Sequence, residues 1–290
     1  MPVYNAERYV DRAIESIRAQ TFGNFEFVIV NDGSTDTTPT ILERHARDDG
    51  RIRILSRPNT GIVGAENDGL GAARGTYIAR IDADDWCDVR RFELQVARLD
   101  REPELVALGS AAAIVDSHGD CLGEFRVPLT HEEIEDRHLK GLSSIHHPSV
   151  MMRADAVKKV GGYREWSRPA DDFDLWLRLG EVGKVANLPE CLVTKRLTID
   201  GIVGSTLGQE MGDAIERILA DTWERRGLPG DPAMPQRTVL NRSDLYRQWT
   251  WLALRSGNKR VARKYALKSV CRQPFHRNAW RAMLCAMRGY

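Results

Sequence analysis

The sequence predicts an α/β fold, in which a doubly wound, mostly parallel sheet is flanked by helices and followed by a C-terminal helical extension. Three observations support this fold class. In the first half, short apolar runs alternate with amphipathic helix patterns, which is the order of a parallel sheet covered by helices. Acidic turns follow two of the predicted strands. Past about residue 208 every pattern is helical.

Each element of the first half has its own signal. Asn5 is the expected cap of a helix whose apolar residues recur at helical spacing, namely Val10, Ala13, Ile14 and Ile17. The run FEFVIV at 25–30 is rich in β-branched and aromatic residues and is followed by NDGST, which predicts a buried strand. We then expect a helix over 38–47, a strand over 51–55, a helix over 63–73 and the strand that opens TYIARIDADDW at 76–86.

In the second half the alternation of strand and helix signals is less regular, and we expect both parallel and antiparallel strand pairing. The predicted elements are a helix over 88–102, strands over 105–110, 111–116 and 149–153, and a helix over 171–180 that turns Phe173, Leu175, Trp176 and Leu179 inward. Thr130 and Glu133 form a capping box for a short helix. Residues 242–274, with a turn at Gly257, resemble one tetratricopeptide-type helix pair, but a single copy does not establish a repeat.

Composition places the chain among ordinary globular proteins, with 42% apolar and 29% charged residues. The longest weakly apolar run, at 106–115, is far shorter than the roughly 20 residues that span a bilayer, so no transmembrane helix is expected. The first nine residues lack a basic region followed by an apolar block, which predicts no cleavable signal peptide. The five cysteines never form a CxxC pair, which argues against a disulfide framework or a zinc site and favours the cytoplasm.

The charge is distributed unevenly along the chain. Residues 236–290 hold 13 Lys or Arg against one acid, Asp244, whereas the preceding 235 residues carry a net charge of −11. We therefore divide the chain into a catalytic domain at 1–207 and a basic helical extension at 208–290. Two interpretations of the extension stay open: its helices dock on the acidic domain, or they contact an anionic membrane peripherally at its inner face. No nucleic-acid recognition motif is present, so no specific nucleic-acid partner is expected.

Acidic side chains follow two predicted strands at the same edge of the sheet. Asp32 lies in the turn after FEFVIV, and Asp82, Asp84 and Asp85 follow the strand that begins near Tyr77. Ligands of doubly wound sheets bind at the carboxyl ends of the strands. Asp-Ala-Asp suits Mg²⁺ or Mn²⁺ with positions left open for a diphosphate, and such a cation would offset the repulsion among the carboxylates. A solvated acidic turn is the alternative for this pattern taken alone.

Five stretches, taken in order, resemble the family 2 glycosyltransferases, which have the GT-A fold. They are residues 2–36 (PVYNAERY through NDGSTD), 57–86 (RPNTGIVGAENDG through DADDW), HHPSVMMR at 146–153, GGYRE at 161–165 and DDFDLWLRL at 171–179. The resemblance runs from residue 1 to about 196. The ordered set is specific, although each piece alone is not.

The resemblance implies roles for individual residues. Asp82 and Asp84 would be the DxD pair, with Asp84 the direct metal ligand and Asp82 near the ribose and diphosphate. Asp172 would be the general base, although acids at a helix N-terminus also complement the helix dipole. Asp32 would hydrogen-bond the base, usually uracil. The other residues expected to bind the nucleotide are Pro2, Val3, Tyr4, Glu7 and Ala83.

The implied function is inverting, metal-dependent transfer of a sugar from a nucleotide donor, usually a UDP-sugar, to a hydroxyl of a glycan or lipid-linked acceptor, as in cell-surface polysaccharide synthesis. A metal would stabilise the departing diphosphate, and a carboxylate would accept the acceptor's proton. Two alternatives are weighed. A sugar nucleotidyltransferase would need a glycine-rich, Lys/Arg-bearing loop near the N-terminus, which is not visible. A non-catalytic nucleotide-sugar-binding or scaffold protein would fit the helical extension.

Some positions depart from the family's pattern. Asn31 replaces the first Asp of DDGS, and Thr198 stands where many relatives have a histidine, so we expect Lys195 or Arg196 to neutralise phosphate. Relatives place an apolar strand directly before PVYN, in the middle of the sheet. We therefore expect this chain to be an N-terminally shortened gene model, which the in-frame codons before Met1 would test.

Two aromatic signals lie near the predicted site. His146 and His147 precede a proline, which is more often a structural arrangement than a contact with acceptor or phosphate. Trp86 is the one tryptophan that we consider for stacking on an acceptor sugar, because it directly follows the acids.

Overall fold

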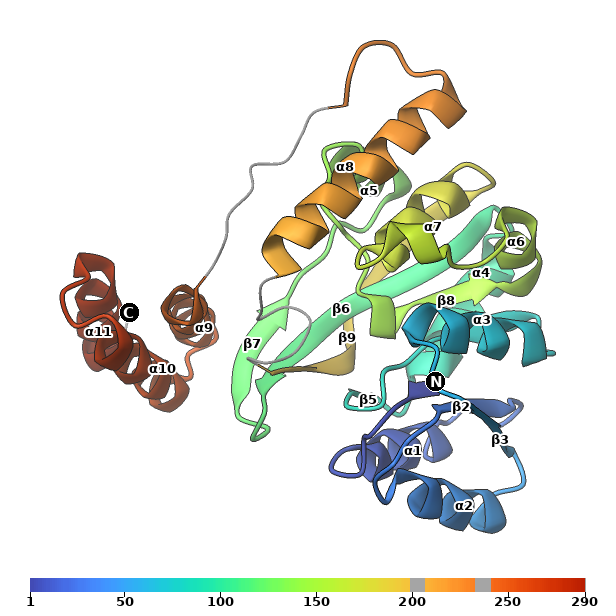
Figure 1. The fold of residues 1–290 in the computed structure, drawn as a ribbon, viewed down its shortest axis with the longest axis horizontal. Coiled ribbons are helices and arrows are strands. Elements are labelled where there is room, and N and C mark those ends of the chain that lie inside the picture. The colour runs from blue at the N-terminus through green and yellow to red at the C-terminus, as the bar shows by residue number, and fades with distance from the viewer. Residues whose placement is uncertain (199–206, 233–240, 290) are drawn as a thin grey trace.

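The computed structural model describes residues 1–198, 207–232 and 241–289, which form two sheets with helices on their faces (Figure 1). This confirms the predicted α/β class. The segment TIDGIVGST, which departs from the family's pattern, lies almost wholly outside the described residues.

The first sheet contains three parallel strands in the order β1 (Pro2–Val3), β2 (Phe27–Asp32) and β3 (Ile52–Arg57). Helices α1 (Val10–Arg18), α2 (Thr38–Asp48) and α3 (Ile62–Ala72) connect these strands to one another and to the next sheet. Successive residues of β2 point to opposite faces. Phe27 and Ile29 join the core beneath α1 and α2, whereas Val28 and Val30 pack with Ala65 of α3.

The second sheet mixes parallel and antiparallel pairs, as expected for this half. Its order is β4 (Tyr77–Ala79), β8 (Met151–Arg153), β6 (Leu105–Asp116), β9 (Lys184–Leu197) and β5 (Trp86–Cys87), and β7 (Cys121–Phe125) also pairs with β6. Among the described strands of this sheet, only β6 and β9 run parallel to each other. The helices of this half are α4 (Arg91–Arg101), α5 (His131–His138), α6 (Ala154–Val160) and α7 (Asp171–Gly180).

Two local predictions need correction. The strands expected over 105–110 and 111–116 are one strand, β6, because Ser110 is fully buried and the chain continues along β9 without a turn. Asn5 does not cap α1, whose N-cap residue is Tyr9. Asn5 instead adopts a positive φ of 47°, and its Oδ1 accepts a hydrogen bond from Thr35 N at 2.8 Å, which ties the two loops at the end of β1 and β2 together.

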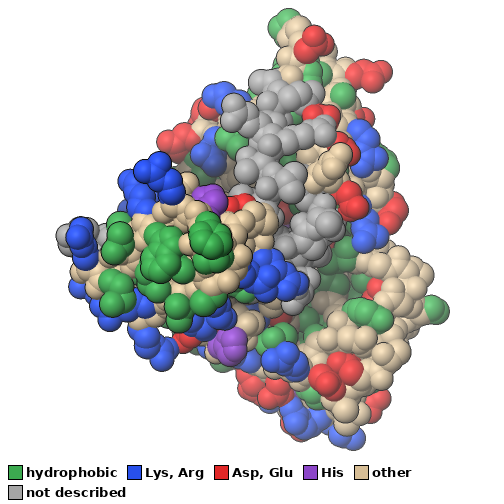
Figure 2. Space-filling model, turned by 60° about the vertical axis from the view of Figure 1, so that its left-hand side comes forward, with side chains coloured by type: hydrophobic (Ala, Val, Ile, Leu, Met, Phe, Trp, Pro, Cys, Tyr) green, Lys and Arg blue, Asp and Glu red, His purple; other side chains and the backbone are tan. Residues whose placement is uncertain are grey.

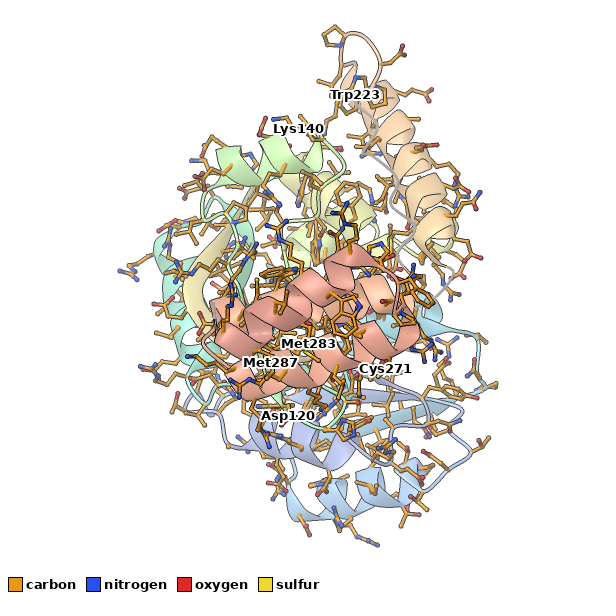
Figure 3. All side chains as sticks on the ribbon, turned by 90° about the vertical axis from the view of Figure 1, so that its left-hand side faces the viewer. Asp120, Lys140, Trp223, Cys271, Met283 and Met287 are labelled. Carbon is orange, nitrogen blue, oxygen red and sulfur yellow. The ribbon has the colours of Figure 1, made fainter. Side chains whose placement is uncertain are left out.

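The C-terminal residues are helical, as predicted. Helix α8 (Leu207–Arg226) packs on α7, and α9 (Arg242–Arg255) and α10 (Lys259–Arg272) form an antiparallel pair that contacts β7. Helix α11 (Arg277–Arg288) completes this group, which Figures 2 and 3 show from its outer side. Within the described ranges, no helix is both long and apolar enough to cross a bilayer.

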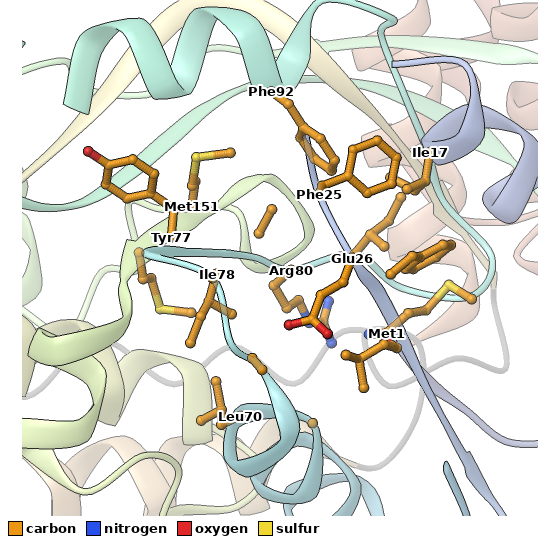
Figure 4. Close-up of a pocket in the computed structure, with 18 of the residues that line it drawn as sticks. Met1, Ile17, Phe25, Glu26, Leu70, Tyr77, Ile78, Arg80, Phe92 and Met151 are labelled. Atoms are coloured by element: carbon orange, nitrogen blue, oxygen red, sulfur yellow. Dashed lines mark hydrogen bonds between the residues drawn. The ribbon is translucent and has the colours of Figure 1, made fainter. Parts of the chain in front are cut away.

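A cavity of about 750 Å³ separates the two sheets. Strand β4, at the end of the second sheet, and the part of β2 that β1 leaves unpaired border it. Met1, Phe25, Ile78 and Phe92 are among the residues that line it (Figure 4). Strand β1 covers only a short stretch of β2, and Met1 N donates to Val28 O at 3.0 Å at the rim. The sheet is therefore interrupted at its centre. The cavity borders the acidic turns but is not itself the site, since Asp82, Asp84 and Asp172 do not line it.

Candidate active site

The turn after β4 brings three carboxylates together. The chain passes from Ala79 through the buried Arg80 and Ile81 into residues 82–85, and β5 begins at Trp86. Potential ligand oxygens of Asp82, Asp84 and Asp85 all lie within 4.8 Å of one another. The predicted pair of acids is therefore a cluster of three.

Asp85, to which the sequence analysis gave no role, is the most deeply buried of the three. Its side chain accepts a hydrogen bond at Oδ1 from Arg196 N at 2.8 Å, while the buried Oδ2 has no partner among the described residues. Burial, together with Asp82 and Asp84, raises the pKa of Asp85 well above its usual range. Three hard oxygen donors, one of them buried and unpartnered, fit a divalent cation such as Mg²⁺ or Mn²⁺.

A buried arginine supplies positive charge beside this cluster. Arg80 Nη1 lies 2.5 Å from Asp82 Oδ2, and Arg80 Nη2 donates to Glu66 Oε1 of α3 at 3.0 Å. Burial raises the pKa of Asp82, but Arg80, Lys195 and the N-terminal amino group together lower it by more, so the pKa of Asp82 lies below its usual value. Burial and the neighbouring Asp82 together raise the pKa of Asp84 to about 6. The guanidinium thus stabilises one carboxylate of the cluster and leaves the others short of positive charge.

Asp172, the predicted general base, lies in the first turn of α7. Its Oδ1 accepts a hydrogen bond from Phe173 N at 2.8 Å, a contact typical of an acid at a helix start. Burial, reinforced by Asp171, raises the pKa of Asp172 to about 6, and Lys195 and Arg80 oppose the rise. A carboxylate with such a pKa is ionised at neutral pH and is able to accept a proton.

Lys195 is the electrostatic link between the acid cluster and Asp172. Its ammonium lowers the pKa of Asp82, Asp84, Asp85 and Asp172. Within the described part of the chain, the Lys195 side chain makes no hydrogen bond or ion pair. Arg196 is engaged instead, because its guanidinium donates to backbone oxygens of Asp84, Asp116 and Ser117. Of the two cations predicted to neutralise phosphate, Lys195 is therefore the available one.

Four of the residues predicted to bind the nucleotide lie in or just after β1, and Ala83 lies in the acidic turn after β4. Pro2 and Val3 form β1, and Val3 is buried, whereas Tyr4 is 52% exposed. Glu7 is exposed and its Oε2 accepts hydrogen bonds from Thr37 N and Oγ1 at 3.1 and 2.6 Å. Ala83 is half-buried and packs against the core between Asp82 and Asp84.

Asp32 ends β2 and is nearly fully buried. Its two carboxylate oxygens accept hydrogen bonds from Thr60 N and Gly61 N at 3.2 and 3.0 Å, where α3 begins. Arg57 Nε lies 3.2 Å from Oδ1. Asp32 thereby holds the loop before α3 against the first sheet.

The aromatic candidates have partners within the protein. His147 is buried, its Nε2 lies 2.7 Å from Tyr163 Oη, and burial lowers its pKa well below the usual range, so the ring is neutral. Burial also lowers the pKa of His146, to about 4. The guanidinium of Arg12 stacks 3.3 Å from the centre of the Trp86 ring. The contact with Tyr163 agrees with a structural role for His147, whereas the buried Nε2 of His146 has no hydrogen-bond partner among the described residues.

Two residues of the site carried weak sequence signals. Arg80 is the single charge inside a run of strand-forming residues, which marks it as unusual but does not identify its partner. Glu66 stands in a helix that is rich in small and apolar residues but also holds Asn67 and Asp68, so it does not stand out. Their pairing depends on how α3 lies against β4, and no pattern in the sequence reports that.

Comparison with known proteins identifies the family. The family model described as glycosyl transferase family 2 matches residues 1–161. An uncharacterized glycosyltransferase of Haemophilus influenzae is 36% identical over 204 residues, which are 67% of this chain and 63% of that protein. A chondroitin synthase of Escherichia coli is 32% identical over 184 residues, which are 63% of this chain and 26% of the synthase. The match thus spans less than two thirds of either relative.

Solved structures share the fold at low sequence identity. S. aureus TarS (residues 1–349, in complex with UDP-GlcNAc) superposes with a TM-score of 0.61 at 17% identity, covering 99% of this chain and 90% of that one. The mannosyltransferase PcManGT from Pyrobaculum calidifontis, in complex with GDP-Man and Mn²⁺, gives a TM-score of 0.56 at 17% identity and covers 99% and 83% of the two chains. Both are GT-A type glycosyltransferases, which confirms the predicted fold class.

Proposed function

Because the chain belongs to glycosyl transferase family 2 and is a glycosyltransferase, we propose that it transfers a sugar from a UDP-sugar to a hydroxyl of a glycan or lipid-linked acceptor, with inversion. We propose a catalytic unit at residues 1–207, a helical extension at 208–290 and a cytoplasmic location. The relative named chondroitin synthase supports polysaccharide synthesis as the setting.

One observation carries the proposal: the carboxylates of Asp82, Asp84 and Asp85 lie within 4.8 Å of one another. Lys195 lowers the pKa of these acids and also that of Asp172, which supports a shared site. Cation and diphosphate chemistry needs the three clustered acids, and proton acceptance needs Asp172. A solvated acidic turn does not explain the burial of Asp85 or its unpartnered oxygen.

In the proposed reaction, Asp172 acts as the general base. With its pKa near 6, the carboxylate is ionised at pH 7 and takes the proton of the acceptor hydroxyl as that oxygen bonds to the anomeric carbon. The bond from this carbon to the diphosphate oxygen breaks, and the diphosphate keeps the electron pair. Attack and departure on opposite sides of the sugar invert the anomeric centre.

Asp84, Asp82 and Asp85 would hold a divalent cation, and this cation would neutralise charge on the departing diphosphate. Lys195 adds a second positive charge on the same side. We assign the nucleotide to the surface formed by Pro2, Val3, Tyr4, Glu7 and Ala83, with Asp32 beside the base. The TarS structure with UDP-GlcNAc supports uridine, and the PcManGT structure with GDP-Man and Mn²⁺ supports the cation.

The test is nucleotide release from a set of UDP-sugars with Mn²⁺ and a glycan acceptor. Asp172→Asn should reduce kcat about 10²- to 10⁴-fold, the usual contribution of a general base, and should keep UDP binding. Asp155→Asn is the matched control, because Asp155 also lies in the first turn of a helix and accepts a 2.8 Å hydrogen bond from the next residue, yet is exposed. Equal activity in the two variants would refute the assignment.

The cation site is tested by thermal shift. Asp84→Asn should lose the stabilisation that Mn²⁺ and UDP together give, whereas Asp88→Asn, an exposed acid outside the cluster, should retain it. A wild-type protein that binds UDP but releases none from any donor would favour the scaffold alternative.

A further inference from the structure

Helices α9 and α10 have one face that packs on the second sheet, and α11 packs on α9 and α10 through its buried alanines. Trp249 and Tyr265 lie in a core cluster with Ala112, Ile114 and Leu122 of β6 and β7. At the edge of this cluster, Lys264 and Arg260 pair with Asp116 and Asp120 at distances from 2.5 to 2.8 Å. These contacts explain how the basic helices dock on the acidic domain, but they pair only some of the basic side chains with acids.

The opposite face of α11 presents large apolar side chains to solvent. Trp280, Leu284 and Met287 lie at helical spacing and are 48%, 57% and 58% exposed. Phe275, just before the helix, is 98% exposed. Figure 2 shows apolar side chains gathered on this part of the surface with Lys and Arg around them, and Figure 3 places Met283 and Met287 along the same helix. A soluble surface rarely carries such a patch without a partner.

Arginines run along the same helix beside the apolar residues. Arg277, Arg281 and Arg288 are exposed, and none of them has an ion pair among the described residues. Residues 241–290 contain twelve Lys or Arg and a single acid, Asp244, which is bound by Arg247. An apolar stripe next to a basic stripe, on a helix that lies along the surface, is the pattern of an interfacial membrane helix.

The charge distinguishes among possible occupants. A second copy of this chain would place one strongly basic face against another, and the acidic sheet already contacts the opposite face of the helices. Nucleic acid would satisfy the arginines but would leave Phe275, Trp280 and Leu284 without an apolar environment. An anionic bilayer offers an apolar environment to the apolar stripe and phosphate groups to the arginines.

We propose that α11 and Phe275 form a docking surface for an anionic lipid bilayer. The helix lies in the plane of the interface, with Phe275, Trp280, Leu284 and Met287 inserted between the headgroups and Arg277, Arg281 and Arg288 bound to lipid phosphates. This surface would hold the enzyme beside lipid-linked acceptors, but the inference does not depend on the transfer reaction.

The test is co-sedimentation of the full chain with vesicles of phosphatidylcholine alone or with about 30% phosphatidylglycerol, at low and high salt. We expect binding only to the anionic vesicles, and weaker binding at high salt, since exposed charges are screened. Because each basic residue contributes about fivefold, R277Q/R281Q/R288Q should weaken binding roughly 100-fold. R47Q/R101Q/R126Q removes the same charge from exposed positions outside the helical extension and should bind as wild type does.

The apolar stripe is tested separately by L284S/M287S, which should weaken binding at least tenfold at unchanged charge. L142S is the control, because Leu142 is 44% exposed but lies on the catalytic unit. Circular dichroism and Tm verify that each variant is folded. The proposal is overturned if the wild type does not bind anionic vesicles, or if the two arginine triple variants bind them equally. Binding of L284S/M287S at the wild-type level would also overturn it, as would binding of an acidic protein in place of lipid.

Discussion

Arg80 sets the charge balance of the acid cluster. It is buried, and it pairs with both Glu66 of α3 and Asp82 of the turn. Burial raises the pKa of Glu66 while Arg80 lowers it, so the pair is held together at a cost in desolvation. Removing one partner is therefore more harmful than removing both.

We expect Arg80→Met to destabilise the fold by about 3 to 5 kcal/mol, because it leaves the buried Glu66 and the half-buried Asp82 without their counter-charge. Adding Glu66→Gln should recover part of this loss. Urea unfolding at pH 7 measures both. Arg53→Met, which breaks the more exposed pair with Glu26, should cost at most about 1 kcal/mol. Equal losses at the two arginines would contradict the role given to Arg80.

The pKa of Asp172 predicts the acidic limb of the pH profile. Since the base must be ionised, kcat/KM at saturating Mn²⁺ should rise up to about pH 6 and level off above it. Lys195→Met removes a positive charge that lowers this pKa, so the limb should move to higher pH. Lys184→Met is the control, because this exposed lysine has only a distant partner in Glu104. An acidic limb at the same pH in Lys195→Met as in the wild type would show that Lys195 does not influence the pKa of Asp172.

Asp172→Asn should stabilise the protein at neutral pH. The folded-state pKa near 6 lies above the usual 3.8, so folding disfavours the ionised form, and stability falls as pH rises from about 4 to about 6. Asparagine avoids this loss. The expected gain is about 1 to 2 kcal/mol at pH 7.5 and should vanish towards pH 4. Thermal unfolding across this range measures it, and a gain that is independent of pH would point to a different cause.

At the scale of elements, the sequence predicted those helices whose bounds depend on residues close together in the chain. The residues 171–180 predicted for α7 are those observed, and the capping box of Thr130 and Glu133 is present at α5. Strand β9 has no comparable signal, because its 14 residues include Pro189 and charged ends and its pairing with β6 shifts register. The same is true of the site. Its acids were recognisable in the sequence, whereas the contacts of Arg80 and Lys195 depend on how elements distant in the chain pack together.

The interrupted sheet makes a prediction about β1. Adding four apolar residues before Met1 should extend β1 along β2 into the cavity that Phe25, Ile78 and Phe92 line. Burial of about 1.5 to 3 kcal/mol per side chain exceeds the ordering cost of about 1 to 2 kcal/mol per residue. Tm should rise by about 5 °C or more. A Gly-Ser extension of equal length should give no gain, and equal gains from the two extensions would exclude strand pairing as the cause.

At the scale of the whole molecule, a chain of polar contacts joins the acid cluster to the C-terminal helices. Arg196 N donates to Asp85, and its guanidinium donates to Asp116 O. The carboxylate of Asp116 is fully buried and accepts hydrogen bonds from Lys264 Nζ and Tyr265 Oη at 2.5 and 2.6 Å. These partners lower the pKa of Asp116 to about 2, although burial raises it. This stabilisation is present above about pH 4 and is lost as pH falls towards 2.

Tyr265→Phe should loosen the attachment of the helices. It removes a hydrogen bond to a buried carboxylate, which is worth about 1.5 to 3 kcal/mol. Tyr246→Phe is the matched control, because Tyr246 stacks on Tyr265 in the same cluster but no hydrogen bond of its hydroxyl is seen among the described residues. Limited proteolysis should release α9–α11 faster from the first variant only. Equal release from both would show that ring packing, not the Asp116 contact, holds the helices.

The cavity between the two sheets imposes a practical condition on work with this protein. Residues placed before Met1 enter at its rim, where Met1 N donates to Val28 O. Apolar residues fit there, whereas a hydrophilic affinity tag or a charged fluorophore would bring unpaired polar groups against Phe25, Ile78 and Phe92. Polar purification handles are therefore poorly placed at that position.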